Sequence, residues 1–293
     1  MVWFWTKKGK KKIKVIKQAL NKTQLAKELG VSRSSLYYQP KRPAIDEEVR
    51  CQIESVLAEH PAYGHKRLAL ALGLNKKRIL RVMKKFNLKP YRRKIRKPIK
   101  KEDQGRPPAN YSNLVEKLIK EKQLNQPGQV WVTDFTYLRF HTRFLYLATV
   151  IDLFTREVVG WHLIRFHNRF LVIGALLQAL EHYPPPLIIH SDQGPEYLSA
   201  DFIDLANHYG LQISMSRKAS PWENGYQESF FGHLKQEGAD WSRFEILGEL
   251  VEEVCRWVYY YNHQRIHSVL KMTPCQFREH YLKARKEEIK SLP

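Results

Sequence analysis

The chain has 293 residues, of which 43% are hydrophobic and 12% aromatic, enough to bury the cores of two or three domains. Its net charge is +21, and the excess is confined to the first third, where residues 1–101 hold 29 Lys and Arg against 6 Asp and Glu. This asymmetry indicates an attached region that binds a polyanion. A nucleic acid is the expected polyanion, because neutralising its phosphates releases counterions and so favours binding. The alternative is a charge run that only keeps the chain in solution.

Export and membrane insertion are not indicated. The apolar start, residues 1–5, is too short for the core of a signal peptide, and lysines follow it closely. No apolar run approaches the length of a transmembrane helix. The three cysteines, Cys51, Cys255 and Cys275, are too scattered for a disulfide framework or a zinc pair. We therefore expect a cytoplasmic protein without a zinc site.

A helical hairpin is predicted early in the basic third. Asn21 or Thr23 can cap a helix that ends before Gly30, which supplies a left-handed turn. Ser32 then caps a second helix that runs to Gln39, where Pro follows. Two helices joined by a glycine turn are typical of helix-turn-helix units.

The same pattern recurs 43 residues later. Residues 25–32 read Leu-Ala-x-x-Leu-Gly-Val-Ser, and residues 68–75 read Leu-Ala-x-x-Leu-Gly-Leu-Asn. One copy would fit any helical hairpin, but two copies inside the basic third predict binding to duplex DNA. A helix over residues 44–60 is expected to join them. Residues 89–101, KPYRRKIRKPIKK, form a basic linker that follows a DNA backbone or acts as a tether. The DNA-contacting candidates here are Arg33, Ser34, Lys76, Arg78, Arg81, Arg92, Arg93 and Arg96.

After Gly128 the residue pattern changes from helical to strand-like, and a mixed α/β domain is predicted. Three strands joined by short turns precede alternating helices and strands, in the order β-β-β-α-β-α-β-α. The expected strands are 130–140, 144–154, 158–164, 186–192 and 211–215, with helices at 169–182, 199–209 and around Glu228. The expected domains are 1–45 and 46–101 (two helix-turn-helix regions, the second with the basic linker), 102–127 (a connecting helix), 128–238 (the catalytic core) and 239–293 (a C-terminal helical segment).

Three acids are candidates for chemistry in this domain. Asp134 lies within an apolar strand, where a carboxylate is costly unless it is paired or bound to metal. Asp192 ends a buried strand, where open α/β sheets place their sites. Asp152 ends a strand before a hairpin, and a turn cap explains it.

The helix around Glu228 combines several roles. Ser220, Pro221 and Glu223 form a capping box at its start, which accounts for Glu223. Trp222, Tyr226, Phe230 and Leu234 form an i+4 stripe that we expect to be buried. Glu228 lies away from that stripe, grouped with Asn224, Gly232 and Lys235 on a polar face that a phosphate backbone can approach. An ordinary solvated face is the alternative.

The sequence resembles a known family at several motifs. These are Trp131-x-x-Asp134-x-Thr136-Tyr137, His190-Ser191-Asp192-x-Gly194, Glu228-Ser229-Phe230-Phe231 and Tyr261-Asn262-x-x-Arg265-x-His267. Asp192 and Glu228 have 35 residues between them. Residues 126–274 resemble the integrase core of bacterial insertion-sequence transposases, and in particular the downstream open reading frame product of the insertion sequence three family. Residues 63–67, Tyr-Gly-His-Lys-Arg, resemble the start of that family's second helix-turn-helix.

The resemblance implies a ribonuclease-H-like catalytic core preceded by an all-α helix-turn-helix region. It implies that Asp134, Asp192 and Glu228 bind two Mg²⁺ ions, with Mn²⁺ as a substitute, and cut and join DNA by in-line transesterification. Lys235, Asn224 and Arg265 would contact DNA. The partners would be the terminal inverted repeats, target DNA and a second copy of the chain, with a further helix-turn-helix from an upstream frame. The location would be a bacterial cytoplasm, at the nucleoid.

Some features depart from the family or remain open. Glu223 stands where the family commonly has Asp, and Gly225 where it has Ala. His263 and His267 are four residues apart and could hold a metal ion, but no third ligand is evident, so DNA contact or packing is favoured. Two other functions are a DNA-binding regulator with an inactive core and a nuclease for RNA–DNA hybrids.

Overall fold

The computed structural model describes residues 21–28, 30, 32–34, 42–91, 111–217 and 225–290. The chain divides into two compact units, residues 1–52 and 53–293. Helix α4 (Arg42–Glu59) crosses the limit between them, so the domain boundary expected at residue 45 lies inside a helix. No helix in these described ranges is both long and apolar enough to cross a bilayer.

The first unit contains helix α2 (Lys22–Glu28). The Oδ1 atom of Asn21 accepts hydrogen bonds from the backbone N–H groups of Thr23 and Gln24, at 3.1 and 3.2 Å. Asn21 is therefore the cap of this helix, and Thr23 lies inside it. Gly30 follows with the left-handed φ of +62° that the sequence predicted.

The second unit begins with a helix-turn-helix made by α5 (His65–Ala71) and α6 (Lys76–Lys85). Gly73 has a φ of +62°, and the side chain of Asn75 caps α6 by accepting a hydrogen bond from Lys77 N at 2.8 Å. Both features agree with the repeated sequence pattern. The fully buried side chains of this region include Ile53, Leu68, Ile79 and Val82.

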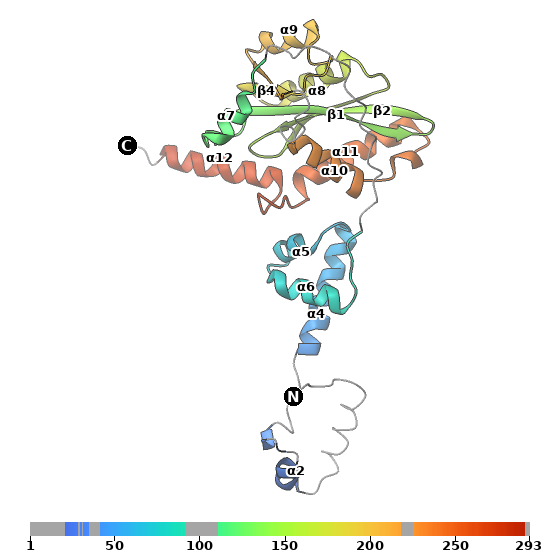
Figure 1. The fold of residues 1–293 in the computed structure, drawn as a ribbon, viewed down its shortest axis with the longest axis vertical. Coiled ribbons are helices and arrows are strands. Elements are labelled where there is room, and N and C mark those ends of the chain that lie inside the picture. The colour runs from blue at the N-terminus through green and yellow to red at the C-terminus, as the bar shows by residue number, and fades with distance from the viewer. Residues whose placement is uncertain are drawn as a thin grey trace. The chain divides into compact units, whose positions relative to one another are not determined.

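A mixed five-stranded sheet forms the centre of the second unit (Figure 1). Its elements are α7 (Leu114–Lys120), β1 (Val130–Phe140), β2 (Arg143–Asp152), β3 (Val158–Ile164), α8 (Arg169–His182), β4 (Ile188–Ser191), α9 (Ala200–His208), β5 (Gln212–Met215), α10 (Gly225–Glu237) and α11 (Leu247–His263). The strand order is β3-β2-β1-β4-β5, with antiparallel pairing among β1, β2 and β3 and parallel pairing of β1 with β4 and of β4 with β5. This is the ribonuclease-H-like fold that we expected.

Strand β2 ends at Asp152, two residues earlier than predicted, because Asp152 caps the turn. Its Oδ1 atom accepts hydrogen bonds from the N–H groups of Phe154 and Thr155, and its Oδ2 atom accepts one from Gly128 N at 2.6 Å. Burial raises the pKa of the Asp152 carboxyl against the effect of these bonds. The expected structural role of Asp152 is confirmed.

Helices cover the two faces of the sheet, and side chains that alternate along β1 enter both cores. Trp131 packs with α8 and α9 on one face, whereas Val130 and Val132 pack with α10 and α11 on the other. Gly160 on β3 allows α8 to approach closely, since a Cβ atom there would lie 2.4 Å from the carbonyl oxygen of Ala175. The face of β1 that carries Val132 is thus the face on which α10 lies.

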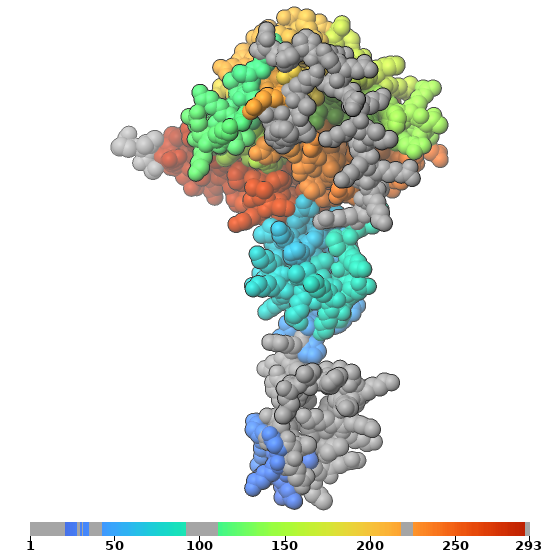
Figure 2. All heavy atoms as spheres, viewed as in Figure 1, coloured from blue at the N-terminus to red at the C-terminus, as the bar shows by residue number. Residues whose placement is uncertain are grey.

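The C-terminal part of the unit is helical. A short 3-10 turn (Trp241–Arg243) leads to α11, and α12 (Pro274–Lys290) begins with the expected first-turn proline. The Thr273 hydroxyl caps it by accepting a hydrogen bond from Gln276 N at 3.2 Å. From Leu282 onward α12 is exposed, and it projects from the core (Figures 1 and 2).

Candidate active site

Two of the predicted acids lie on neighbouring parallel chain segments, Asp134 within β1 and Asp192 directly after the end of β4. In the parallel pairing of β1 with β4, Val132 lies opposite His190. Asp134 and Asp192 each come two residues later. Because side chains alternate along a strand, a two-residue step returns to the same face, so Asp134 shares the face of Val132. The register of one strand pair therefore brings the two carboxyl groups together below α10.

Glu228 is near enough to Asp134 for its charge to affect the pKa of the Asp134 carboxyl. Burial raises the pKa of the Asp134 carboxyl to about 8, and the charges of Asp192 and Glu228 add to the rise. A hydrogen bond of 2.8 Å from Phe135 N and the charge of Lys235 act in the opposite direction. Asp134 is thus close enough to both Asp192 and Glu228 for their charges to oppose its ionisation.

A fourth acid, which the sequence reasoning missed, lies beside Asp192. Glu196 is only 6% exposed, and its Oε1 atom pairs with His167 Nε2 at 3.1 Å. Its Oε2 atom is buried and has no hydrogen-bond partner among the described residues. Burial raises the pKa of the Asp192 carboxyl and the charge of Glu196 adds to this, while a hydrogen bond from Gly194 N at 3.0 Å opposes it. An acid four residues after Asp192 was the available signal.

The donor set suits a hard divalent cation. Across the described ranges, no three Asp, Glu, His or Cys side chains are gathered tightly enough to hold a metal ion as they stand. The mutual repulsion at Asp134 and the unpaired buried oxygen of Glu196 are nevertheless what a bound cation would relieve. Carboxylate oxygens are the ligands that Mg²⁺ prefers. Asp134, Asp192 and Glu228 therefore fit a magnesium site by their chemistry.

A buried glutamine fixes α10 to the sheet, and the sequence reasoning did not single it out. Gln227 is fully buried, and its amide nitrogen donates to the carbonyl oxygens of Val132 at 2.7 Å and Thr149 at 3.3 Å. Its amide oxygen accepts a hydrogen bond from the Thr149 hydroxyl at 3.1 Å. Glu228 is the next residue, so this contact with β1 and β2 sets its height above Asp134.

The predicted buried stripe of α10 is wrong at Tyr226. The residues of α10 that are buried are Gln227, Phe230, Phe231 and Leu234. Tyr226 is 36% exposed and lies beside that face, with the Arg156 guanidinium 4.1 Å from its ring centre. Trp222 and the expected capping box at residues 220–223 lie outside the described residues. Glu228 is exposed on the other side of the buried face, so α10 has two distinct flanks.

Lys235 lies on the flank of Glu228. Its ammonium nitrogen is 4.7 Å from the ring centre of Tyr137, a residue of β1. Burial lowers the pKa of Lys235, and the charge of Asp134 opposes this. This cation is therefore close to the acids, as the predicted contact with a DNA phosphate requires. Asn224, which we expected on the same face, lies outside the described residues.

Arg265 does not have the exposure that DNA contact requires, and this prediction is wrong. The side chain is 1% exposed, and its Nε and Nη2 atoms donate to Glu237 at 2.6 and 2.8 Å. Burial opposes ionisation of Glu237, but hydrogen bonds from Arg265 and His233 and the charge of Arg67 hold its pKa well below the usual range. Arg265 is therefore an internal ion-pair partner at the end of α10.

The same ion pair includes the second helix-turn-helix. Arg67 Nη1 on α5 lies 3.1 Å from Glu237 Oε1. Nearby, the hydroxyl of Tyr63 accepts a hydrogen bond from Ile266 N at 2.7 Å. Two residues of the Tyr-Gly-His-Lys-Arg motif thus attach α5 to α10 and to the segment that follows α11. Glu237 is the last residue of α10, whereas Glu228 lies in its first turn.

The two C-terminal histidines make packing contacts. His263 stacks on Tyr259 with ring centres 4.5 Å apart, and its Nε2 atom is 3.7 Å from the sulfur of Cys275. His267 is partly buried, and its Nδ1 atom has no hydrogen-bond partner within the described ranges. Neither belongs to a metal-binding cluster of the described residues.

The candidate DNA contacts of the basic third are partly described. Lys76, Arg78 and Arg81 are exposed along α6, the second helix of its helix-turn-helix. Arg33 and Ser34 are helical and exposed, while the rest of their predicted helix lies outside the described residues. Arg92, Arg93 and Arg96 also lie outside them. The exposed side chains of α6 have the position that contact with a DNA groove requires.

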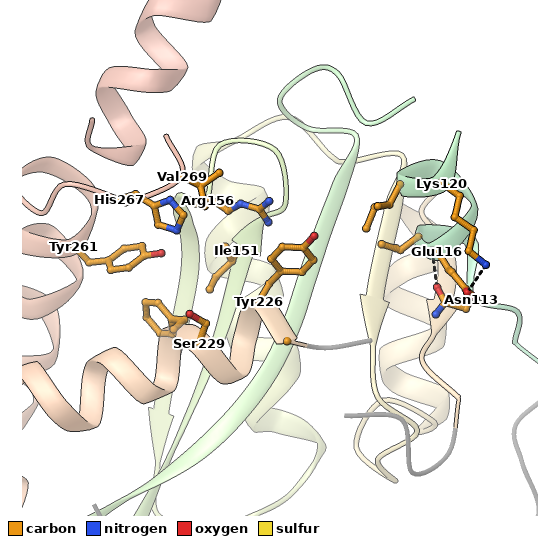
Figure 3. Close-up of a pocket in the computed structure, with 14 residues that line it drawn as sticks. Asn113, Glu116, Lys120, Ile151, Arg156, Tyr226, Ser229, Tyr261, His267 and Val269 are labelled. Carbon is orange, nitrogen blue, oxygen red and sulfur yellow. Dashed lines mark hydrogen bonds and ion pairs between the residues drawn. The ribbon is translucent and has the colours of Figure 1, made fainter. Parts of the chain in front are cut away.

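A pocket of about 530 Å³ lies on the flank of α10 away from Glu228 (Figure 3). Tyr226 and Ser229 of α10 line it, together with Arg156 and His267. Burial lowers the pKa of His267 to about 4, and the nearby arginine charges contribute.

A ribonuclease-H-like sheet with one acid within β1, a second directly after β4 and a third on the helix across them defines an integrase-type core. In agreement, residues 125–221 and residues 209–274 match the integrase core domain family. The catalytic core domain of HTLV-2 integrase, solved in complex with magnesium, is 20% identical with a TM-score of 0.42 and covers 52% of this chain and 97% of its own.

Similar proteins, one of which matches most of the chain, identify the family within this class. The transposase for insertion sequence element IS904 of Lactococcus lactis is 33% identical over 245 residues, covering 80% of this chain and 95% of the relative. The transposase InsF for insertion sequence IS3A of Escherichia coli is 41% identical over 113 residues, covering 38% of this chain and 39% of the relative. The chain belongs to the insertion sequence three family of bacterial transposases.

Proposed function

We propose that this transposase cuts the ends of its insertion element and joins the freed 3′-hydroxyls to DNA by metal-dependent in-line transesterification. The observation that carries the proposal is the matched position of Asp134 and Asp192 on neighbouring parallel strands, with the charge of Glu228 reaching Asp134. Carboxyl groups that repel one another at one edge of a sheet are suited to cations and to the phosphates those cations attract.

Asp134, Asp192 and Glu228 are the ligands of Mg²⁺ in this proposal, with two ions per site and Mn²⁺ as a substitute. When bound, the pair of ions supplies stabilisation of the entering and leaving oxygens of the displacement. Gln227 holds Glu228 at a fixed height above the sheet through its bonds to Val132 and Thr149. The carboxylates thus keep a preorganised arrangement, which is where most of the catalytic effect of such sites arises.

The reaction has two displacements of the same kind. A water attacks a phosphodiester at the element end and frees a 3′-hydroxyl, which then attacks a second phosphodiester. Lys235 holds the terminal phosphate or the adjacent base, and its contact with Tyr137 keeps the ammonium near Asp134. No covalent protein–DNA intermediate is required, so no serine or tyrosine is assigned as a nucleophile.

In this proposal the basic region binds DNA and the core catalyses the reaction. Residues 1–45 and 46–101 bind the terminal inverted repeats, residues 102–127 connect, residues 128–238 catalyse, and residues 239–293 complete the C-terminal helical segment. The placement of most positive charge before residue 102 supports this. Two element ends react together, so the active form is at least a dimer on DNA, with an upstream-frame helix-turn-helix protein as a further partner.

The test is strand transfer with element-end DNA in Mg²⁺. The variants Asp134→Asn, Asp192→Asn and Glu228→Gln each lose strand transfer by about 10³-fold or more, because each removes a ligand charge without changing shape. Binding of the element end, measured by electrophoretic mobility, stays within about twofold. Asp204→Asn, at an exposed acid of α9, is the control and keeps full activity.

Retention of full activity by any of the three variants removes that acid from the proposal. Two further outcomes assign other functions. A wild-type chain that binds element ends but never cuts them in Mg²⁺ or Mn²⁺ is a DNA-binding regulator. A chain that cuts RNA–DNA hybrids in preference to duplex element ends is a hybrid nuclease.

A further inference from the structure

The turn after β4 contains a buried acid that local structure only half explains. Glu196 is 6% exposed, and one of its oxygens, Oε1, pairs with His167 Nε2 at 3.1 Å. Its other oxygen, Oε2, is buried and has no hydrogen-bond partner in the part of the chain that the structure describes. An unpaired buried carboxylate oxygen destabilises the fold, and more so when it is charged, so a cation that occupies this space would remove that cost.

Gly194 shows where that oxygen points. A Cβ atom built on Gly194 would lie 3.0 Å from Glu196 Oε2 and 3.0 Å from Asp192 Oδ1. The two carboxyl oxygens therefore border the same small space, which stays open because residue 194 has no side chain. A positive φ does not account for this glycine, since Gly194 is not among the residues with that conformation. The open space beside two acids accounts for it.

His167 orients Glu196 rather than neutralising both of its oxygens. The imidazole contacts two aromatic rings, stacking on Tyr146 at 5.2 Å and meeting Phe135 at 4.7 Å between ring centres. With its ring fixed in this way, Nε2 meets Oε1 and leaves Oε2 on the side of Asp192. A purely structural ion pair would explain Oε1 and would leave Oε2 and the glycine unexplained.

We propose that Glu196 is a fourth acid of the metal site and that its Oε2 atom is an oxygen donor to the divalent ion held by Asp192. This inference rests on the proposed function, because it extends the same site. Asp134 and Glu228 approach Asp192 from β1 and α10, whereas Glu196 comes from the turn after Asp192 itself. The ion at Asp192 would then have protein oxygens on two sides.

Binding of Mn²⁺ to the full chain, followed by the electron paramagnetic resonance signal of the free ion, tests the inference without relying on activity. Glu196→Gln keeps the shape and the bond to His167 but loses the charge, and it lowers Mn²⁺ affinity by about 10-fold or more. Asp192→Asn, a ligand variant, lowers it at least as much. Asp204→Asn, the exposed acid on α9, leaves it unchanged.

Gly194→Ala provides a second variant that leaves Glu196 intact. Its methyl group fills the space between the two oxygens, so Mn²⁺ affinity falls by about the same factor while the bond between His167 and Glu196 remains. Thermal unfolding of each variant without metal accompanies the titration, which separates loss of metal binding from loss of fold. If Glu196→Gln does not fold, Gly194→Ala decides the question.

The outcomes separate this inference from the proposed function. If Asp192→Asn binds Mn²⁺ as the wild type does, the metal site of the proposed function is wrong. If Asp192→Asn loses binding while Glu196→Gln and Gly194→Ala keep it, the site stands and the role of Glu196 is overturned. A lower melting temperature of Glu196→Gln with unchanged Mn²⁺ affinity likewise overturns it, because that is the signature of a structural ion pair.

Discussion

The side-chain amide of Gln227 donates a hydrogen bond of 2.7 Å to the carbonyl oxygen of Val132, two residues before Asp134 on the same strand. Gln227 also immediately precedes Glu228. This one bond therefore links the helix that carries one predicted ligand to the strand that carries another. A shift of α10 by even a fraction of a turn would break it, so the position of Glu228 relative to Asp134 depends on a residue that has no chemistry of its own.

Gln227→Met is expected to destabilise the fold by about 1–3 kcal/mol, because it leaves the carbonyls of Val132 and Thr149 and the Thr149 hydroxyl buried with fewer partners. It also lowers the rate of strand transfer at saturating DNA by about 10-fold or more, since misplacement of a catalytic group weakens it steeply. Element-end binding should change little. Denaturant unfolding and single-turnover kinetics measure the two effects.

The matched control for Gln227 is Gln212→Met, at an exposed position of β5, which should alter neither quantity appreciably. Equal loss of DNA binding and of rate by Gln227→Met would point instead to general disruption of the fold. Unchanged kinetics in a folded variant would show that Gln227 does not position Glu228.

The buried ion pair at the end of α10 should be a strong determinant of stability. Glu237→Gln leaves Arg265 and Arg67 facing each other without a compensating charge, and a loss of about 3–5 kcal/mol is expected. Glu252→Gln provides the matched control, because its partner Arg256 and Glu252 itself are 63% and 71% exposed. That variant should lose under about 1 kcal/mol. Denaturant unfolding of both variants makes the comparison, and similar losses would contradict the internal role of Glu237.

Some features of the fold are determined by residues that are close together in the sequence. The strands, the turn glycines Gly30 and Gly73 and the helix cap Asn75 were predictable because neighbouring residues determine them. The grouping of Asp134 with Asp192 was implied by the resemblance of the short motifs around them to the integrase core. Each of these follows from a pattern within a few residues.

Features that depend on distant partners were not predictable. Arg265 was expected to contact DNA from the family resemblance alone, and the partner that buries it, Glu237, is 28 positions away. The buried face of α10 was misplaced because Gln227, a polar residue, belongs to it and an apolar stripe skips it. Glu196 had no local signal beyond its distance from Asp192. Burial of polar groups is specified by partners that a single sequence does not reveal.

His267 should make stability depend on pH in the mildly acidic range. Burial lowers the pKa of His267 to about 4, with the charges of Arg156 and Arg265 contributing (Figure 3). The unfolded chain takes up this proton near pH 6.5, whereas the folded chain does not until about pH 4. The contribution to stability is therefore present above pH 6.5 and is lost as the pH falls toward 4.

Between pH 7.5 and pH 5, the wild type should lose about 1–2 kcal/mol more unfolding free energy than His267→Gln does. Denaturant unfolding at both pH values provides the measurement. His208→Gln, at an exposed position of α9, should follow the wild type at both. Parallel behaviour of His267→Gln and the wild type would show that His267 is protonated as easily in the folded chain as in the unfolded one.

Arg78 on α6 should contribute to recognition of the element end. Its side chain is exposed on the second helix of a helix-turn-helix, the helix that enters the major groove in such units. Arg78→Ala is expected to weaken binding to the inverted repeat by about 1–3 kcal/mol if it contacts a base, and to weaken binding to a scrambled duplex less.

Arg256→Ala, on α11, is the control for the loss of one positive charge. Fluorescence anisotropy at several salt concentrations separates the cases, because loss of a phosphate contact weakens both duplexes alike and lowers the salt dependence by about one ion. If Arg78→Ala binds both duplexes as the wild type does, α6 is not the helix that reads the element end.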